Sequence, residues 1–383
     1  MTETLADLVM SRRVLVTVGA GGVGKTTTAA ALGVAAARRG KRVLCLTIDP
    51  ARRLAESLGL ETMSAEEQVV ERGLFERAGI PMAGSLTAMM LDTKRTFDEL
   101  VVRHSSSPEH ARKLLDNRLY QYVSTSLAGT QEYMAMEKLV AVKEDPRFDL
   151  VILDTPPTAN ALDFLDAPER LAEAIDSAAM RWFVQAFEST GTLSLNVLAR
   201  SAAVVLRGLG RITGGGFLAA MAEFISELND LFGGFKQRAK MVEEALRSSE
   251  VSFVLVTSPA PMSLQEVVYF SERLESSRMP RGAFVVNRFR LPPPGADAPP
   301  SERDAALAIA RHKLVLDEDA PGRLVHAHAD AVRLAALDAV NVQALDAKAR
   351  GRVPIVRVAE LASDVHDLGK LGAIAEALMS GGV

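Results

Sequence analysis

The residues with the clearest chemistry form a glycine-rich loop near the start of the chain. Residues 19–26 read Gly-Ala-Gly-Gly-Val-Gly-Lys-Thr, which fits the phosphate-loop pattern G-x-x-x-x-G-K-[ST]. Glycines let successive backbone N–H groups turn inward around phosphates, and the N-terminus of a following helix adds partial positive charge. The residues predicted to contact the nucleotide phosphates are Gly19, Ala20, Gly21, Gly22, Val23, Gly24, Lys25, Thr26 and Thr27.

Three of these side chains have separate predicted tasks. We expect Lys25 to reach the β- and γ-phosphates of ATP, and the Thr26 hydroxyl to bind Mg²⁺. Thr27 is expected near the α-phosphate. The alternative is a glycine-rich turn without a ligand, which is disfavoured because the loop follows a predicted strand and opens a predicted helix over residues 27–39.

Two carboxylates follow other predicted strands. Asp49 comes after the apolar run 43–48, and Asp154 after the run 150–153. Because the carboxyl ends of parallel strands meet at the ligand crevice, we expect both residues near the loop. There they would hold Mg²⁺ through water and orient the attacking water. For each, a helix cap or a turn residue is the alternative.

The elements that must position these residues alternate along the chain. Short apolar runs recur between helical stretches and are mostly continuous, as in strands buried on both faces. Right-handed crossovers then give an α/β fold with a doubly wound, mostly parallel sheet, typical of a P-loop NTPase, with a helical insert subdomain. The predicted strands cover residues 13–18, 43–48, 86–91, 150–153, 252–257, 283–286 and 354–358.

Helical segments interrupt this rhythm without forming separate domains. Residues 95–145 and 160–248 are predicted to be helical inserts growing out of one domain that spans residues 1–383. Residues 301–350 are predicted to form a helical hairpin broken near Pro321 and Gly322. The last helix is predicted over residues 359–379, packed on the core, since its polar side chains are mainly acidic whereas membrane-surface helices are basic.

Composition excludes several classes of protein. The formal net charge of −4 gives no general attraction to nucleic acid or to anionic lipid. The only cysteine, Cys45, lies in an apolar run, so an internal disulfide or a cysteine-based metal site is excluded. No apolar run approaches the ~20 residues needed to cross a bilayer. We therefore expect a cytoplasmic protein without an integral membrane segment.

The motifs together resemble the ArsA-type ATPases, the family of the arsenite-pump ATPase and the targeting factor for tail-anchored membrane proteins. The resemblance rests on the glycine-doubled loop, on Asp49-Pro-Ala and on Asp154-Thr-Pro-Pro-Thr158. Asn287 and the late Val353-Pro354 extend it over most of the chain. The resemblance implies that Asp49 lies in switch I and activates the hydrolytic water, and that Asp154 lies in switch II. It also implies that Asn287 contacts adenine, although a strand-end asparagine is also a common turn residue.

This chain departs from the family pattern at one position of the loop. ArsA-type ATPases usually carry a second lysine directly after the first loop glycine, which acts across a nucleotide-gated dimer, whereas this chain has Ala20. Either Arg52 or Arg53 replaces that charge in a homodimer, or a lysine-bearing paralogue supplies it in a heterodimer. The second arrangement resembles the paired ArsA-like ATPase subunits of bacteria.

Two functions of different classes follow. The first is a Mg-dependent, ATP-hydrolysing dimeric switch whose apolar helical insert binds a hydrophobic client, such as a membrane-protein segment. The alternative is a regulatory nucleotide-binding subunit that assembles with a paralogous ATPase and has little turnover of its own. The large apolar content of residues 180–235 motivates the switch that binds a client, although packing in the core or in a dimer interface is a simpler explanation of these residues. Ala20 motivates the regulatory subunit.

Overall fold

The computed structural model describes residues 3–48, 53–60, 62–117, 120–121, 124, 130–155, 237–238, 240–365 and 367–382. The chain divides into two compact units. The first comprises Met1–Met89, Arg147–Ala159 and Ser249–Val383, and the second comprises Met90–Pro146 and Asn160–Ser248.

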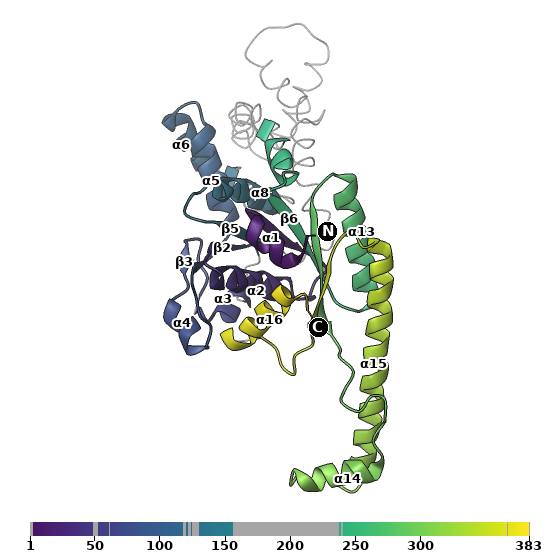
Figure 1. Cartoon of the computed structure of the whole chain (residues 1–383). Helices are drawn as coiled ribbons and strands as arrows, with labels where there is room; N and C mark the ends of the chain where they lie inside the picture. The colour runs from purple at the N-terminus through teal and green to yellow at the C-terminus, as the bar shows by residue number, and fades with distance from the viewer. Residues whose placement is uncertain are drawn as a thin grey trace, which may run out of the picture. The chain divides into compact units, whose positions relative to one another are not determined.

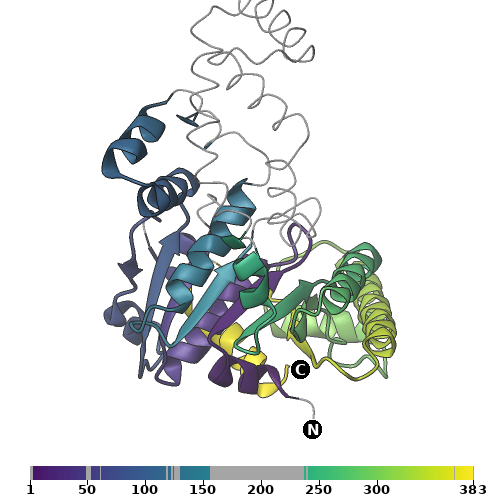
Figure 2. The same cartoon turned by 90° about the horizontal axis from the view of Figure 1, so that it is seen from above.

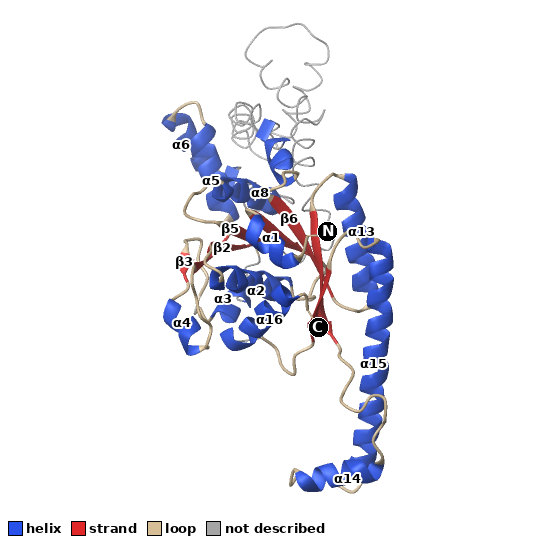
Figure 3. Ribbon diagram, viewed as in Figure 1, coloured by secondary structure: helices blue, strands red, loops and turns tan. Residues whose placement is uncertain are grey.

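The first unit is built on a sheet of eight strands in the order β3-β4-β2-β5-β1-β6-β7-β8, drawn in red in Figure 3. Pairing is parallel from β2 through β5, β1, β6 and β7 to β8, whereas β3 and β4 are antiparallel. The doubly wound, mostly parallel α/β fold predicted from the sequence is confirmed. The strands are β1 (Val14–Val18), β2 (Arg42–Thr47), β3 (Gln68–Val69), β4 (Ser85–Met90), β5 (Leu150–Asp154), β6 (Val251–Thr257), β7 (Arg281–Phe289) and β8 (Ile355–Ala359).

All seven predicted strands are present, with ends shifted by a few residues. Every residue of β1, β5 and β6 is buried, which explains their continuous apolar sequences. The eighth strand, β3, was not predicted. It has only two residues, too few for a period-2 pattern to show in the sequence.

Helices cover both faces of this sheet (Figure 2). One face carries α1 (Leu5–Ser11), α2 (Lys25–Arg38), α3 (Arg53–Leu58) and α16 (Leu368–Ser380), which pack against one another. On the other face, α13 (Pro261–Ser276) and α15 (Ala320–Ala349) cover β6 and β7. The short α4 (Arg72–Arg77) follows β3, and α14 (Glu302–Arg311) precedes α15.

The last helix begins later than predicted. Residue Ala359 ends β8, and α16 starts at Leu368, so the prediction of a helix from residue 359 is wrong. Asp367 caps the helix by accepting a hydrogen bond from the Lys370 backbone N–H at 2.8 Å, a signal that marks the true start. The apolar face of α16 is buried in the core with α2, which confirms core packing. Among the described residues, no helix is long and apolar enough to cross a membrane.

The helices α14 and α15 occupy residues 302–349 and are joined by residues 312–319. The break predicted near Pro321 and Gly322 falls at residues 312–319, directly before α15. Pro321 itself lies in the first turn of α15, where the missing N–H of proline costs nothing. Asn341 donates to the Pro259 carbonyl at 3.1 Å, just past the end of β6. The Arg290 backbone N–H, just past the end of β7, donates to Asp338 at 3.0 Å.

Residues 338–341 of α15 are therefore level with the carboxyl ends of β6 and β7. Residues 320–337 run beyond them, and at 1.5 Å per residue this part of α15 is ~27 Å long. We call α14, residues 312–319 and residues 320–337 the arm, which is visible in Figure 1 as the long α15 with α14 at its far end.

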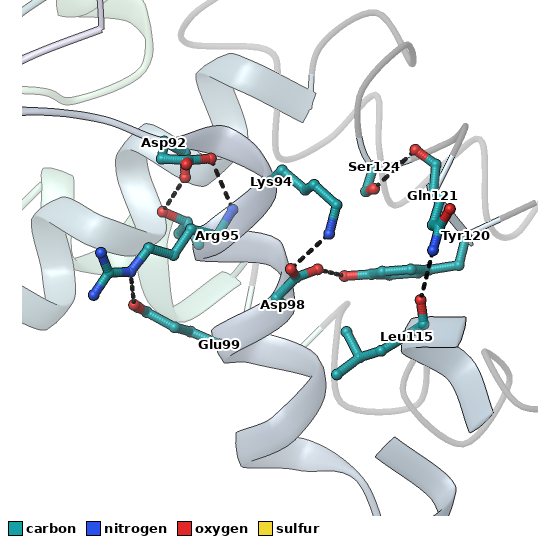
Figure 4. Close-up of polar contacts among 10 residues, drawn as sticks. Asp92, Lys94, Arg95, Asp98, Glu99, Leu115, Tyr120, Gln121 and Ser124 are labelled. Atoms are coloured by element: carbon teal, nitrogen blue, oxygen red, sulfur yellow. Dashed lines mark hydrogen bonds and ion pairs between the residues drawn. The ribbon is translucent and has the colours of Figure 1, made fainter. Parts of the chain in front are cut away.

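The second unit contains α5 (Thr93–His104), α6 (Pro108–Asp116) and α8 (Thr130–Lys143) among its described residues. Figure 4 shows the polar contacts between Tyr120 and α5. Its hydroxyl donates to Asp98 at 2.6 Å, and Lys94 pairs with the other oxygen of Asp98 at 2.7 Å. The Tyr120 ring is fully buried and lies 5.5 Å from that of Phe97. Most of residues 160–248, including the apolar stretch 180–235, lies outside the described residues.

Candidate nucleotide-binding site

The glycine-rich loop joins β1 to α2, as predicted. Three of its glycines have positive φ angles: 153° at Gly19, 78° at Gly22 and 95° at Gly24. Gly24 is the N-cap of α2 in a left-handed conformation, and the helix begins with Lys25. Several backbone N–H groups at the start of a helix lack intrahelical partners, so this loop has the strand, turn and helix of an anion-binding site.

A glycine is also required at position 24 because the side chain of Asn287 lies very close to it. A Cβ atom at this position would lie 2.2 Å from Nδ2 of Asn287. Asn287 is near the carboxyl end of β7, and its Nδ2 donates to the Val23 carbonyl at 2.9 Å. Asn287 therefore lies against the loop, and its hydrogen bond joins the end of β7 to the loop backbone. The role of Asn287 in binding adenine stays a prediction.

Lys25 is buried and folded back over the loop. Its Nζ donates to the carbonyls of Gly19 at 2.9 Å and Ala20 at 2.8 Å. A buried ammonium needs such acceptors because its desolvation is costly. Phosphate oxygens entering the loop are stronger, charged acceptors, so nucleotide binding is expected to exchange some of these carbonyl contacts for phosphate contacts.

Asp154 is at the centre of a buried polar cluster. It ends β5, between β2 and β1, and is 1% exposed. Its Oδ2 accepts hydrogen bonds from the Thr26 hydroxyl at 2.8 Å and from the Thr47 hydroxyl at 3.0 Å. The structure thus brings together Thr26 and Asp154, the two predicted metal ligands that it describes. It also adds Thr47, the last residue of β2.

Two further threonines fix the backbone beside this carboxylate. The Thr155 hydroxyl donates to the Thr17 carbonyl at 2.8 Å, and the Thr17 hydroxyl donates to the Leu153 carbonyl at 3.2 Å. Thr17, Thr47 and Thr155 were not predicted as site residues. The available signal was their position: each lies at the carboxyl end of a strand or directly after it, where ligand crevices form.

The remaining sequence predictions fall partly outside the described residues. Asp49 and Arg52 lie outside them, as does the side chain of Arg53. Ala20 is described: its methyl group is half-buried and packs against the hydrophobic core. Cys45 is buried, and burial, with the nearby charge of Asp154 second, raises the pKa of its thiol far above the ordinary value. Its predicted role as a core residue is confirmed.

The oxygen atoms at this site suit a hard cation. Mg²⁺ prefers oxygen ligands and is usually held by one or two protein groups together with water and phosphate oxygens. The Thr26 hydroxyl and the Asp154 carboxylate fit that need. Among the described residues, no cluster of three or more acidic, histidine or cysteine side chains is assembled, so a metal held by the protein alone is not seen in that part of the chain.

Comparison with known proteins gives a consistent answer. Residues 12–303 match the family described as anion-transporting ATPase, of the ArsA type. The chain is similar to ATPase GET3 of Podospora anserina, with 26% identity over 284 residues, covering 73% of this chain and 74% of the relative. ATPase GET3 of Malassezia globosa is 26% identical over 282 residues, covering 73% of each. ATPase GET3 of Phaeosphaeria nodorum is 24% identical over 277 residues, covering 72% and 76%.

Proposed function

The chain belongs to the ArsA-type anion-transporting ATPases, and we propose that it is a Mg-dependent ATPase switch whose nucleotide binds on the loop of residues 19–26. One observation carries the proposal. The loop hydroxyl of Thr26 lies 2.8 Å from the strand-end carboxylate of Asp154, although 128 positions separate them in sequence. That pair supplies the two oxygen ligands a nucleotide-bound Mg²⁺ needs from this fold.

Each described residue then has a defined task. The loop N–H groups and the N-terminus of α2 hold the phosphates, and the ammonium of Lys25 neutralises charge on the β- and γ-phosphates. Thr26 binds the metal directly, and Asp154 holds it directly or through water. Mg²⁺ held by these two residues would supply positive charge to offset the negative charge that develops during phosphoryl transfer.

For the remaining steps, the proposal rests on the sequence. Asp49 orients the attacking water, as the ArsA-type pattern implies, and Asn287 contacts adenine. The nucleotide state gates a dimer, formed either by two copies or by this chain with a lysine-bearing paralogue. The dimer presents an apolar helical surface to a hydrophobic client, and residues 160–248 are the segment proposed to carry that surface.

The test compares the aspartate that ends β5 with the aspartate that precedes it. Asp154→Asn removes the charge beside Thr26, whereas Asp149→Asn changes a half-buried aspartate that precedes the same strand and pairs with Arg42 at 2.7 Å. ATP turnover and ATP affinity are measured for both variants across a Mg²⁺ titration. We expect Asp154→Asn to abolish the Mg²⁺ dependence and to lower turnover at least a hundredfold, and Asp149→Asn to leave both unchanged. Wild-type Mg²⁺ dependence in Asp154→Asn would refute the proposal.

A second measurement addresses Asp49 separately. In Asp49→Asn, ATP should still bind while turnover is lost, because the substitution removes the base-like oxygen and keeps the size of the side chain. The mass of this variant in solution, with and without Mg-ATP, then reports dimerisation of the ATP-bound state. A variant that hydrolyses ATP at the wild-type rate would remove Asp49 from the mechanism.

One observation favours the alternative of a regulatory subunit. The Ala20 side chain packs against the core and supplies no charge to a neighbouring subunit. If low intrinsic turnover follows from this missing charge, Ala20→Lys should raise the turnover of the isolated chain, and unchanged turnover would remove the reason for that alternative.

A further inference from the structure

The end of the arm exposes an apolar tripeptide to solvent. Leu314, Val315 and Leu316 connect α14 to α15, and their exposed fractions are 55%, 98% and 52%. Single exposed apolar residues are normal, but three consecutive ones at the end of a projecting element form a patch typical of interaction sites. Leu307 and Leu324, with exposed fractions of 62% and 45%, lie in the two helices that this segment joins.

Charges flank the tripeptide in a symmetrical order. Residues 311–319 read Arg-His-Lys-Leu-Val-Leu-Asp-Glu-Asp, so basic residues precede the apolar centre and acidic residues follow it. All nine are exposed. When two copies meet about a two-fold axis at Val315, the basic residues Arg311 and Lys313 of each copy lie on the side of the acidic residues Asp317 and Asp319 of the other. The leucines at 314 and 316 face one another across the same axis.

A sequence that complements itself in this way satisfies the requirement of an isologous contact, in which residue i meets residue j and residue j meets residue i. We propose that residues 311–319 are a self-association site, at which the arms of two copies of this chain pair antiparallel about a two-fold axis through Val315. This surface is separate from the nucleotide loop, and the proposal does not depend on the proposed switch mechanism.

The backbone of the segment is partly engaged within the chain. The Leu314 N–H donates to the Ile309 carbonyl at 3.1 Å, and the Asp317 carbonyl accepts from the Ala320 N–H at 3.2 Å. The proposed contact therefore rests on the exposed side chains around Val315 and on the charges that flank them. Asp317 already forms an ion pair with Arg323 at 2.8 Å. Because that pair is exposed to solvent, it is weak, and Asp317 can exchange Arg323 for another partner.

The arm is held firmly enough to present this segment. Asp338, which is buried, accepts from the Arg290 backbone N–H at 3.0 Å and pairs with the Arg290 guanidinium at 3.4 Å. Farther along the arm, the His328 ring nitrogen Nε2 hydrogen-bonds the Pro294 carbonyl at 3.0 Å. Such preorganisation lowers the entropy lost on association. Since the paired segments are short, the contact belongs among small interfaces, and we expect a dissociation constant in the micromolar range, about 1–100 μM.

Sedimentation velocity of the nucleotide-free chain at 1–200 μM tests the proposal. The wild-type chain should show a reversible monomer–dimer equilibrium that weakens with salt, because the flanking charges are exposed. Val315→Asp should weaken dimerisation at least tenfold. Val340→Asp is the matched control, since Val340 is 61% exposed on α15 but lies outside residues 311–319, which we call the tip. This variant should leave the monomer–dimer equilibrium unchanged.

Charge exchange gives the sharper result. Arg311→Glu with Lys313→Glu makes an all-acidic tip, and Asp317→Lys with Asp319→Lys makes a mainly basic one. Each double variant alone should be monomeric, whereas an equimolar mixture should form a heterodimer, detected with fluorescent labels of two colours. Circular dichroism and ATP turnover, which should match the wild-type chain, confirm that the variants are folded.

Three outcomes would overturn the proposal. The first is a monomeric wild-type chain at 200 μM, and the second is a mixture that shows no heterodimer. The third is Val315-dependent flotation of the chain with anionic vesicles in the absence of self-association, which would assign the tip to a lipid surface. Dimers that appear only with ATP and persist in Val315→Asp belong to the nucleotide-gated contact and count against the tip as the site of association.

Discussion

Replacing Gly24 by alanine tests how the loop, the helix start and β7 depend on one another. Two costs are expected. Alanine at a φ angle of 95° is in the left-handed region, which costs about 1–2 kcal/mol. The new methyl group would also lie 2.2 Å from Nδ2 of Asn287. The side-chain amide of Asn287 must then move away from the Val23 carbonyl. The hydrogen bond between them is lost, at a further cost of about 1 kcal/mol.

The loop contains a control for the first cost alone. Gly22 has a φ angle of 78°, and a Cβ atom added there would have no heavy atom within 4 Å. Gly22→Ala should therefore cost about 1–2 kcal/mol, and Gly24→Ala about 2–3 kcal/mol. Combining Gly24→Ala with Asn287→Ala removes the clash. Relative to Asn287→Ala alone, that double variant should lose only the backbone cost.

Urea unfolding of the chain, followed by circular dichroism, measures these differences, and calorimetric titration with ATP shows whether the loop still binds. A difference of 1.4 kcal/mol corresponds to tenfold in the unfolding equilibrium, which is well within resolution. Equal costs for Gly22→Ala and Gly24→Ala would refute the steric argument. So would a Gly24→Ala cost that is unchanged when Asn287 is already alanine, since the clash would then have no measurable part in it.

Three further predictions follow. The hydrogen bonds from Arg42 lower the pKa of Asp149 to about 2, below the value of about 3.9 in the unfolded chain. The contribution of Asp149 to stability is therefore present above pH ~4 and is lost as the pH falls towards 2. The difference in melting temperature between the wild type and Asp149→Asn should narrow across that range. Tyr120→Phe should lower the free energy of unfolding by about 1–3 kcal/mol, measured by urea denaturation, whereas Tyr269→Phe, at a residue 60% exposed, should have almost no effect. The buried thiol of Cys45, whose pKa is raised by burial, should react with a thiol reagent only after unfolding, and rapid reaction of the folded chain would contradict its placement in the core.

Much of the fold was predictable because the strongest signals are local. Continuous apolar runs indicated seven of the eight strands, and the G-x-x-x-x-G-K-[ST] pattern placed the loop between β1 and α2. The exceptions have local causes as well. The strand β3 is too short for a periodic pattern, and α16 begins at its Asp367 cap because residues 355–359 pair with β7 as a strand.

Residues that act together across the sheet were harder to foresee. The sequence predicted that Thr26 and Asp154 both hold Mg²⁺ beside the loop, whereas their direct hydrogen bond of 2.8 Å follows from the adjacency of β5 and β1. Thr47 joins them because β2 lies on the other side of β5. Strand order is set by which apolar faces pack together in the whole sheet, and a short run of residues does not encode that order.

The residue types and their spacing are enough to indicate the chemistry of this protein: a loop that can hold phosphates, a lysine and a threonine that can act on them, and carboxylates at strand ends. The tertiary structure alone decided how those groups meet. It placed Asn287 against the loop from the end of β7 and fastened Arg290 to a buried aspartate of α15. It also extended residues 311–319 away from the sheet. Local residue types fix what a side chain can bind, whereas contacts between distant segments depend on the packing free energy of the whole chain.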